Sequence, residues 1–133
     1  MNLTDLDHVG IACTDLEAEI ARYRNLFGVE VAHREVVADQ GVEEALLPVG
    51  DSFVQLLRPL GPDTPVGRFL AERGPGLHHL AFRVDDVGAA LARLRAEGAQ
   101  LVDETPRAGS RGTRIAFVHP KAMGGVLIEL VEP

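Results

Sequence analysis

The sequence of 133 residues contains one cysteine, one tyrosine and no tryptophan. A single thiol can form neither an internal disulfide nor a cysteine-rich metal site. Cys13 lies in an apolar run, where a buried and unreactive thiol is a more common role than a nucleophile. The sequence therefore excludes a disulfide framework and gives no sign of cysteine chemistry.

Long apolar segments and an excess of positive charge are absent as well. Residues 1–7 lack the basic region and apolar stretch of a signal peptide, and no run has the length of a transmembrane helix. Thirteen basic residues stand against twenty acidic ones, which gives a net charge of −7. A chain of this charge repels a phosphate-rich polymer. We expect a cytoplasmic protein with no nucleic-acid or membrane partner, while a small anionic ligand stays compatible with local basic residues.

Two stretches of the sequence repeat at a constant offset of 71 residues. The matched pairs are His8 with His79, Asp15 with Asp86, Arg22 with Arg93, and Arg24 with Arg95. The apolar positions between them also stay in step. Self-similarity of this kind indicates two copies of one structural unit.

Each copy is predicted to fold as βαβββ. An apolar run of β-type residues is followed by an Asp helix N-cap, a helix that ends at a glycine, and three more strands. In the first copy we expect strands over residues 9–13, 29–37, 43–49 and 53–58, with a helix over 16–27. In the second we expect strands over 80–84, 99–105, 113–119 and 126–132, with a helix between Val87 and Gly98. A Pro/Gly-rich connector with a short helix over 66–73 joins the copies.

The fold class that follows is α+β. With 46% hydrophobic and 25% charged residues, the chain should fold, and its length suits one domain of residues 1–133. Module one covers about residues 5–60, the connector about 61–75 and module two about 76–133. A four-stranded sheet with one helix leaves a face uncovered, and two such sheets can solve this by curling around a shared cleft. We predict tandem βαβββ modules that form an eight-stranded, partly open barrel.

Polar residues interrupt two strands that are otherwise apolar. Because side chains alternate along a strand, Gln55 shares a face with Phe53 and Leu57. Glu129 likewise lies between apolar neighbours on its own face, and the opposite face is apolar too. A buried carboxylate is costly unless it is paired or binds a metal. Something must therefore compensate Glu129.

The first strand of each copy supplies a histidine to the same pattern. Taken singly, His8, Gln55, His79 and Glu129 each have ordinary structural explanations, but together they occupy matched positions of the repeat. Two imidazoles, a carboxylate and an amide oxygen suit a divalent ion such as cobalt, manganese, nickel, zinc or magnesium. These four residues are the predicted metal ligands. Of the other histidines, His78 should face away from His79, His33 is expected at the surface, and His119 in a turn is interpreted as structural.

The sequence resembles the vicinal oxygen chelate superfamily and, along nearly its whole length, the methylmalonyl-CoA epimerase family within it. The motifs that carry the resemblance are Asp7-His8-Val9-Gly10-Ile11-Ala12, Asp39-Gln40-Gly41-Val42-Glu43-Glu44-Ala45, Val54-Gln55-Leu56-Leu57-Arg58-Pro59, Gly76-Leu77-His78-His79-Leu80-Ala81-Phe82, His119-Pro120-Lys121 and Gly124-Gly125-Val126-Leu127-Ile128-Glu129-Leu130. The Gln-Gly-Val and His-Pro-Lys segments are the more specific to the epimerases.

The resemblance implies an epimerase that interconverts (2R)- and (2S)-methylmalonyl-CoA by 1,1-proton transfer through a metal-stabilised enolate. It places the metal ligands at His8, Gln55, His79 and Glu129, with one divalent ion per subunit, cobalt being favoured, and no separate organic cofactor. It makes Glu44 a catalytic acid/base, with Glu129 as the second, and the adjacent Glu43 should face away. A homodimer and a small acyl-CoA substrate are implied. Arg107, Arg111 and Lys121 are unranked candidates for the CoA phosphates.

Alternatives stay open at this point. A glyoxalase I-type lyase or isomerase would use a similar ligand set, a non-catalytic small-molecule-binding protein shares the fold, and a dioxygenase would need an iron set that Gln55 interrupts. For the epimerase itself, one base with a rotating enolate competes with two bases on opposite sides.

Overall fold

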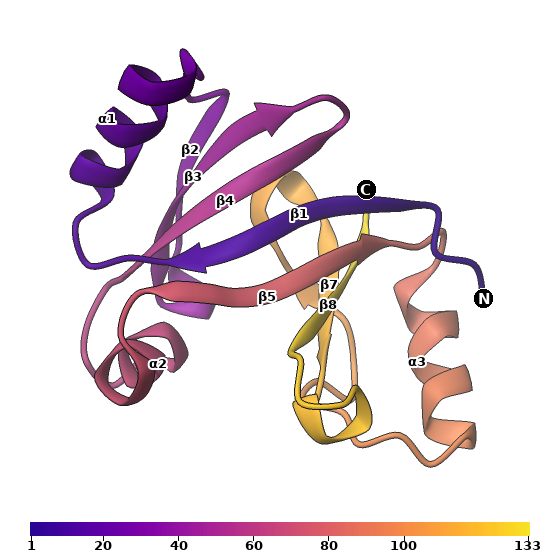
Figure 1. Ribbon diagram of the computed structural model, residues 1–133. Coiled ribbons are helices and arrows are strands. Elements are labelled where there is room, and N and C mark those ends of the chain that lie inside the picture. The colour runs from indigo at the N-terminus through magenta and orange to yellow at the C-terminus, as the bar shows by residue number, and fades with distance from the viewer. The chain divides into compact units, whose positions relative to one another are not determined.

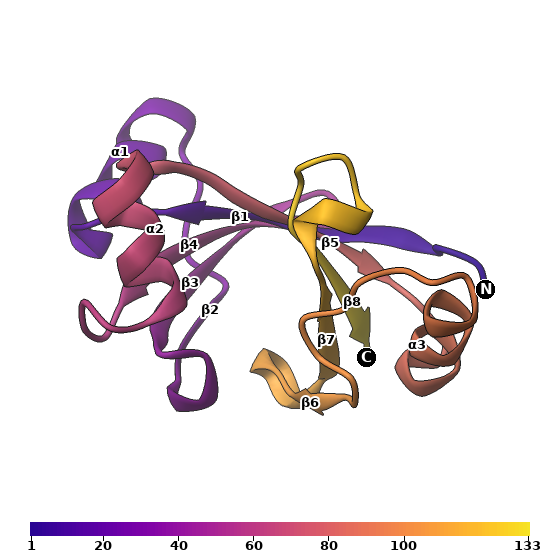
Figure 2. The same cartoon turned by 90° about the horizontal axis from the view of Figure 1, so that it is seen from below.

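The computed structural model describes residues 1–133, with eight β-strands and three α-helices. The chain divides into two compact units. We call His8–His78 the N-module, and Met1–Asp7 together with His79–Pro133 the C-module. The strand order is β2-β3-β4-β1 in the N-module and β5-β8-β7-β6 in the C-module (Figures 1 and 2). The prediction that the two form a single domain stays a prediction.

The N-module contains the predicted βαβββ set. Its elements are β1 (Asp5–Ala12), α1 (Leu16–Phe27), β2 (His33–Val37), β3 (Val42–Val49), β4 (Ser52–Pro59) and the connector helix α2 (Pro65–Arg73). Strand β1 begins in the C-module and runs parallel to β4, whereas β2, β3 and β4 are antiparallel neighbours. The second strand is shorter than predicted, since it begins at residue 33 instead of 29.

Helix α1 begins and ends where its sequence predicts. The Asp15 carboxylate accepts a hydrogen bond from the backbone N–H of Ala18 at 3.0 Å, which satisfies one free donor of the first turn. Gly28 adopts a left-handed φ of 69° and donates its N–H to the Arg24 carbonyl at 2.9 Å. Helix α3 of the C-module repeats this start, because the Asp86 carboxylate accepts from the Ala89 N–H at 2.9 Å.

The C-module departs from prediction at one strand. Its elements are β5 (Gly76–Arg83), α3 (Val87–Ala96), β6 (Arg107–Ala108), β7 (Arg114–Val118) and β8 (Ile128–Glu132), with the first residues of β5 in the N-module. The predicted strand over residues 99–105 is wrong, and the sixth strand is β6. Near β7 the backbone N–H groups of Val102 and Asp103 both bond to the Phe117 carbonyl, at 3.0 and 3.2 Å. The Asp103 carboxylate accepts the Phe117 N–H at 2.8 Å, so a side chain replaces the carbonyl that a regular ladder would use.

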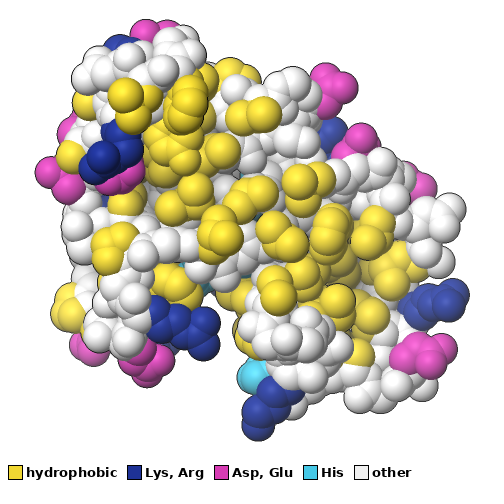
Figure 3. All heavy atoms as spheres, in the orientation of Figure 1, with side chains coloured by type: hydrophobic (Ala, Val, Ile, Leu, Met, Phe, Trp, Pro, Cys, Tyr) yellow, Lys and Arg dark blue, Asp and Glu magenta, His cyan; other side chains and the backbone are white.

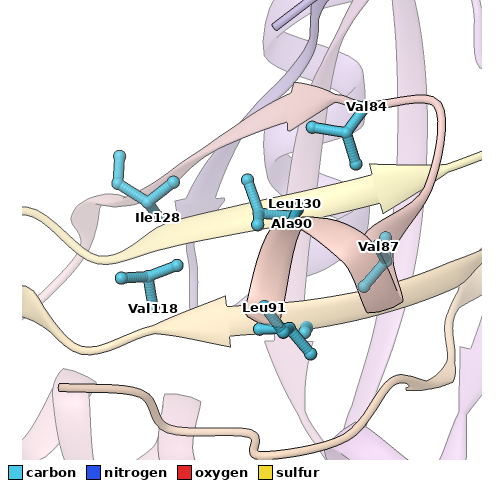
Figure 4. Close-up of a cluster of buried hydrophobic side chains, with 8 residues drawn as sticks. Val84, Val87, Ala90, Leu91, Val118, Ile128 and Leu130 are labelled. Atoms are coloured by element: carbon cyan, nitrogen blue, oxygen red, sulfur yellow. The ribbon is translucent and has the colours of Figure 1, made fainter. Parts of the chain in front are cut away.

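In each module α1 or α3 packs on one face of the sheet, and the polar site residues lie on the other face, part of which α2 covers in the N-module. In the N-module, Leu16 and Ile20 of α1 pack with Ala45, Leu47 and Leu56. In the C-module, the helix-covered cluster is Val84, Val87, Ala90, Leu91, Ala116, Val118, Ile128 and Leu130 (Figure 4). Because side chains alternate along a strand, Gln55 and Glu129 each lie on the face of their sheet that is opposite α1 or α3. Figures 1 and 2 show α1 and α2 beside the N-module strands and α3 beside β7 and β8.

Several large apolar side chains are exposed. Leu26, Phe27 and Leu77 are 69%, 73% and 71% exposed, and Figure 3 shows hydrophobic side chains over much of the face in view. Exposed apolar area of this kind is what a subunit interface would cover. The homodimer stays a prediction, which sedimentation analysis can test. None of the helices combines the length and apolar character needed to cross a bilayer.

Cys13 provides the first prediction. Its side chain is 3% exposed, its Sγ lies 3.5 Å from the Leu57 carbonyl oxygen, and burial is the largest cause that raises the thiol pKa to about 11. At pH 8 the reactive thiolate is therefore scarce as well as shielded. We expect the native protein to resist a thiol-specific reagent such as Ellman's reagent and to react fully once unfolded in guanidinium. Rapid labelling of the native protein would contradict this assignment.

A buried carboxylate in β1 fixes a distant turn of the C-module. Asp7 is 1% exposed, and its two oxygens accept from Arg83 Nε at 2.7 Å and from Arg111 Nη2 at 2.6 Å. Arg111 lies in the turn η2 (Ser110–Gly112) and is the one non-glycine residue with a positive φ, 57°. The ion pair thus joins residues 104 positions apart and holds a backbone conformation that side chains disfavour.

Replacing Asp7 with Asn should destabilise the protein strongly. Two guanidinium groups would lose their shared buried partner, and breaking a buried pair costs about 3–5 kcal/mol of unfolding free energy. Urea denaturation measures the loss. The control is Glu104→Gln, which removes an exposed ion pair with Arg95 and should cost less than about 1 kcal/mol. Similar losses in the two variants would count against the assigned role of Asp7.

Candidate active site

Three predicted site residues lie on the face of the N-module sheet opposite α1, which also carries the apolar cluster that packs against α2. The register of β1 and β4 pairs Gly10 with Gln55, so His8 and Gln55 lie on the same face of neighbouring strands. Glu44 of β3 reaches the same face from the other side of β4. The exposed fractions of His8, Gln55 and Glu44 are 2%, 5% and 0%. Three polar side chains are therefore buried where apolar ones would ordinarily pack.

A hydrogen bond between Gln55 and Glu44 orders part of this group. The Gln55 Nε2 donates to Glu44 Oε2, which is the only sense in which an amide and a carboxylate can pair. The second oxygens, Gln55 Oε1 and Glu44 Oε1, are buried without a hydrogen-bond partner. A buried acceptor without a partner costs free energy unless something else satisfies it. The two oxygens are thus available to a ligand.

Two residues that the sequence did not predict as part of the site lie beside Glu44. Glu35 of β2 is the direct cross-strand partner of Glu44, and the Nε2 of His33 lies 2.8 Å from Glu35 Oε1. His33, Glu35 and Glu44 each bring a ligand atom within 4.8 Å of the others. His33 was expected at the surface and is partly exposed, and the pairing of β2 with β3 is what brings it and Glu35 beside Glu44. The signal in the sequence was the spacing of two residues between His33 and Glu35, which places both side chains on one face of a strand.

The C-module contributes a buried histidine–carboxylate pair. His79 Nε2 lies 2.9 Å from Glu129 Oε1, and the two side chains are 3% and 5% exposed. The register of β5 and β8 pairs Ala81 with Glu129, which places His79 and Glu129 on one face. The predicted requirement that Glu129 be compensated is met inside this module.

The strand registers show which positions of the two modules correspond. Gln55 pairs with Gly10, and Glu129 pairs with Ala81, the residue 71 positions after Gly10. Gln55 and Glu129 are therefore equivalent, as His8 and His79 are. The position equivalent to Glu44 holds Ile115, which is 1% exposed. A carboxylate at the position of Glu44 is thus present in one module only.

The ligand-type residues fit a divalent cation. Each module offers one imidazole and one oxygen-bearing side chain on the same buried face. The unpartnered Gln55 Oε1 is a neutral oxygen donor, and Glu129 supplies one negative charge. Nitrogen and oxygen donors of this kind suit a hard-to-borderline divalent metal.

Glu43 differs from its neighbour Glu44, as expected. It faces the other way and pairs with Arg58 at 3.0 Å and Arg34 at 3.2 Å. The hydrogen bond from Arg58 is the largest cause that lowers the pKa of Glu43. An alternating strand therefore presents one carboxylate to cations near the surface and the next to the buried face.

A glycine sets the approach of β3 to the site. Gly41 follows the short turn η1 (Ala38–Gln40) with a φ of 69°, and a Cβ there would come within 2.6 Å of Thr64 Cγ2. Both the conformation and the close contact require glycine. The Gln-Gly-Val motif thus fixes the turn that leads into the strand carrying Glu44.

The remaining basic candidates have distinct surroundings. His78 packs edge-on against Phe69 of α2 with ring centroids 4.9 Å apart, and His119 Nδ1 accepts the Lys121 N–H at 3.0 Å. That both histidines are structural stays a prediction. Arg107 pairs with Asp103 at 3.2 Å, and Arg111 with Asp7. The remaining candidate for the CoA phosphates, Lys121, is exposed in the turn η3 (Pro120–Ala122).

Comparison with known proteins identifies the family to which the chain belongs. Residues 7–117 match the sequence model of the Glyoxalase/Bleomycin resistance protein/Dioxygenase superfamily. The ethylmalonyl-CoA/methylmalonyl-CoA epimerase of Cereibacter sphaeroides is 40% identical over 94% of this chain and 95% of its own. The crystal structure of methylmalonyl-CoA epimerase from Mycobacterium tuberculosis is 49% identical, with a TM-score of 0.94 over 98% of this chain and 89% of that one.

A methylmalonyl-CoA epimerase structure in complex with methylmalonyl-CoA and NH4+ is 47% identical, with a TM-score of 0.94 over 98% of this chain and 95% of that one. These likenesses extend over nearly the whole chain, and the predicted fold class is confirmed by the superfamily match. The chain belongs to the Glyoxalase/Bleomycin resistance protein/Dioxygenase superfamily and, within it, to the methylmalonyl-CoA epimerases.

Proposed function

We propose that the protein interconverts (2R)- and (2S)-methylmalonyl-CoA by moving the proton at C2, with one divalent cation at its site. The observation that carries this proposal is the fully buried Glu44 carboxylate, hydrogen-bonded to Gln55, in a chain that is 40% identical to one acyl-CoA epimerase and 49% identical to another. A base held in this way suits proton abstraction next to a carbonyl group. The reaction class is an isomerase reaction.

The proposed ligands of the cation are His8, Gln55, His79 and Glu129. Bound there, a divalent cation supplies a Lewis acid for the oxygen on which negative charge develops. Two neutral imidazoles, an amide and one carboxylate leave about one positive charge at the site, which matches one developing negative charge. The bond from Gln55 Nε2 to Glu44 keeps the amide oxygen turned toward the ligand position. The identity of the metal, with cobalt favoured, stays a prediction.

Inversion at C2 needs a proton removed from one side of a planar enolate and delivered to the other. We assign Glu44 to one side and Glu129, which is also a proposed ligand, to the other. Glu44 lies in β3 and Glu129 in β8. The two carboxylates are not equivalent in the repeat, because the position equivalent to Glu44 holds Ile115. A single base with rotation of the enolate is the competing scheme.

For the CoA phosphates we favour Lys121. Arg107 and Arg111 already neutralise Asp103 and Asp7, and Lys121 is the candidate that has no carboxylate partner in the structure. The other activities considered have weaker support. Glu44 and the acyl-CoA epimerase relatives argue against a glyoxalase, and the full set of ligand-type residues argues against a non-catalytic binding protein. A cytoplasmic location stays a prediction.

Replacing Glu44 with Gln should lower kcat by about 100- to 10,000-fold, the range that a general base contributes. The amide can still accept from Gln55, so the fold and the metal content should persist. Steady-state assay with metal analysis measures both effects. Glu43→Gln is the matched control, because the neighbouring carboxylate faces away and should leave kcat near the wild-type value. Loss of metal together with activity would remove Glu44 from its assigned role.

Proton NMR of (2R)-methylmalonyl-CoA in D2O tests the reaction itself. With metal-loaded protein we expect deuterium to replace the C2 proton and the two epimers to appear, and treatment with EDTA should stop both. Exchange without epimerisation would keep the enolate and exclude the two-base scheme. With metal confirmed to be bound, the absence of exchange would reject the epimerase proposal.

A further inference from the structure

Phe117 lies against the histidine of the C-module. It belongs to β7, is 7% exposed and is the direct cross-strand partner of Glu129. Its ring meets the His79 imidazole edge-on, with centroids 5.5 Å apart and an interplanar angle of 82°. His79 is therefore bounded by two neighbours, with the Glu129 carboxylate at Nε2 and the Phe117 ring beside the imidazole.

Phe117 is itself held by two charged residues. The Arg107 guanidinium carbon lies 5.6 Å from the centroid of its ring, within the range of a cation–π contact. Asp103 pairs with Arg107 at 3.2 Å and also accepts the backbone N–H of Phe117 at 2.8 Å. One carboxylate thus fixes both the backbone of Phe117 and the cation over its ring.

The orientation of an imidazole ring needs such support. Rotation about the bond to the ring has broad, shallow minima, so packing and hydrogen bonds decide where the nitrogens point. Groups that orient a metal-binding histidine change metal affinity when they are altered. We propose that Phe117, held by Arg107 and Asp103, is a positioning residue that sets the ring plane of His79 for metal binding. This rests on the proposed metal site.

The N-module lacks this arrangement. Leu46 pairs with Gln55 as Phe117 pairs with Glu129, so the equivalent position holds a leucine. The two modules therefore differ in the residue that faces the oxygen-bearing side chain, which is Leu46 in one and Phe117 in the other. It also supplies the test variant, because Phe117→Leu introduces the residue that the other module uses and keeps an apolar side chain. Phe117→Met is a second non-aromatic variant for the case that the leucine protein folds poorly.

Val118 provides the matched control. It neighbours Phe117 in β7, is 1% exposed and packs on the opposite face in the α3 cluster. Val118→Ala should lower the melting temperature without reaching the proposed metal site. The dissociation constant for Co2+, the visible absorption spectrum of the Co2+-loaded protein and the melting temperature without metal are measured for wild type and all variants.

We expect Phe117→Leu to weaken Co2+ binding by about 10- to 100-fold, the range found when a supporting partner of a ligand is changed, and to shift the Co2+ absorption bands. Val118→Ala should keep the wild-type affinity and spectrum at a lower melting temperature. Wild-type affinity and bands in folded Phe117→Leu or Phe117→Met would overturn the positioning role while leaving the metal site standing. Failure of the wild-type protein to bind Co2+ would overturn both the metal site and the positioning role. The experiment therefore distinguishes failure of the positioning role alone from failure of the metal site.

Discussion

The need to satisfy polar groups on a buried sheet face governs the organisation of the site. Glu44 is fully buried, and it is tolerated because Gln55 donates to one of its oxygens. His79 and Glu129 compensate each other in the same way in the second module. A carboxylate without such a partner would cost several kcal/mol or take up a proton. The pairing also leaves free the oxygens of Glu44 and Gln55 that a ligand can use.

Duplication supplied the scaffold, and divergence between the copies made it asymmetric. Equivalent positions hold Gln55 and Glu129 as oxygen donors, but the position of the C-module that is equivalent to Glu44 holds the buried Ile115. Helices α1 and α3 pack on the face opposite these positions, so the differences between the copies lie away from that packing. The C-module has Phe117 where the N-module has Leu46, whereas the N-module has Glu44 where the C-module has Ile115.

Most of the fold could be predicted because its signals are local. Asp15 and Gly28 delimit α1 as capping residues do, and the offset of the repeat gave the second module. The strand predicted over residues 99–105 failed because the Asp103 side chain replaces a backbone acceptor, which composition does not reveal. For the site, alternation identified Gln55 and Glu129 as out of place. The neighbours of Glu44, His33 and Glu35, depend on the register of β2 with β3, which no local pattern specifies.

The two modules differ in how their residues are ordered along the chain. The N-module is one continuous segment, His8–His78, whereas the C-module joins the first seven residues to His79–Pro133. On a ribosome, where the N-terminal part emerges first, the N-module can therefore fold while the rest is still being made. Asp7 must wait for Arg83 and Arg111, 76 and 104 residues later, before both of its buried ion pairs can form. The earliest residues to be synthesised are thus among the last to be placed, and the C-module closes only when translation is nearly complete.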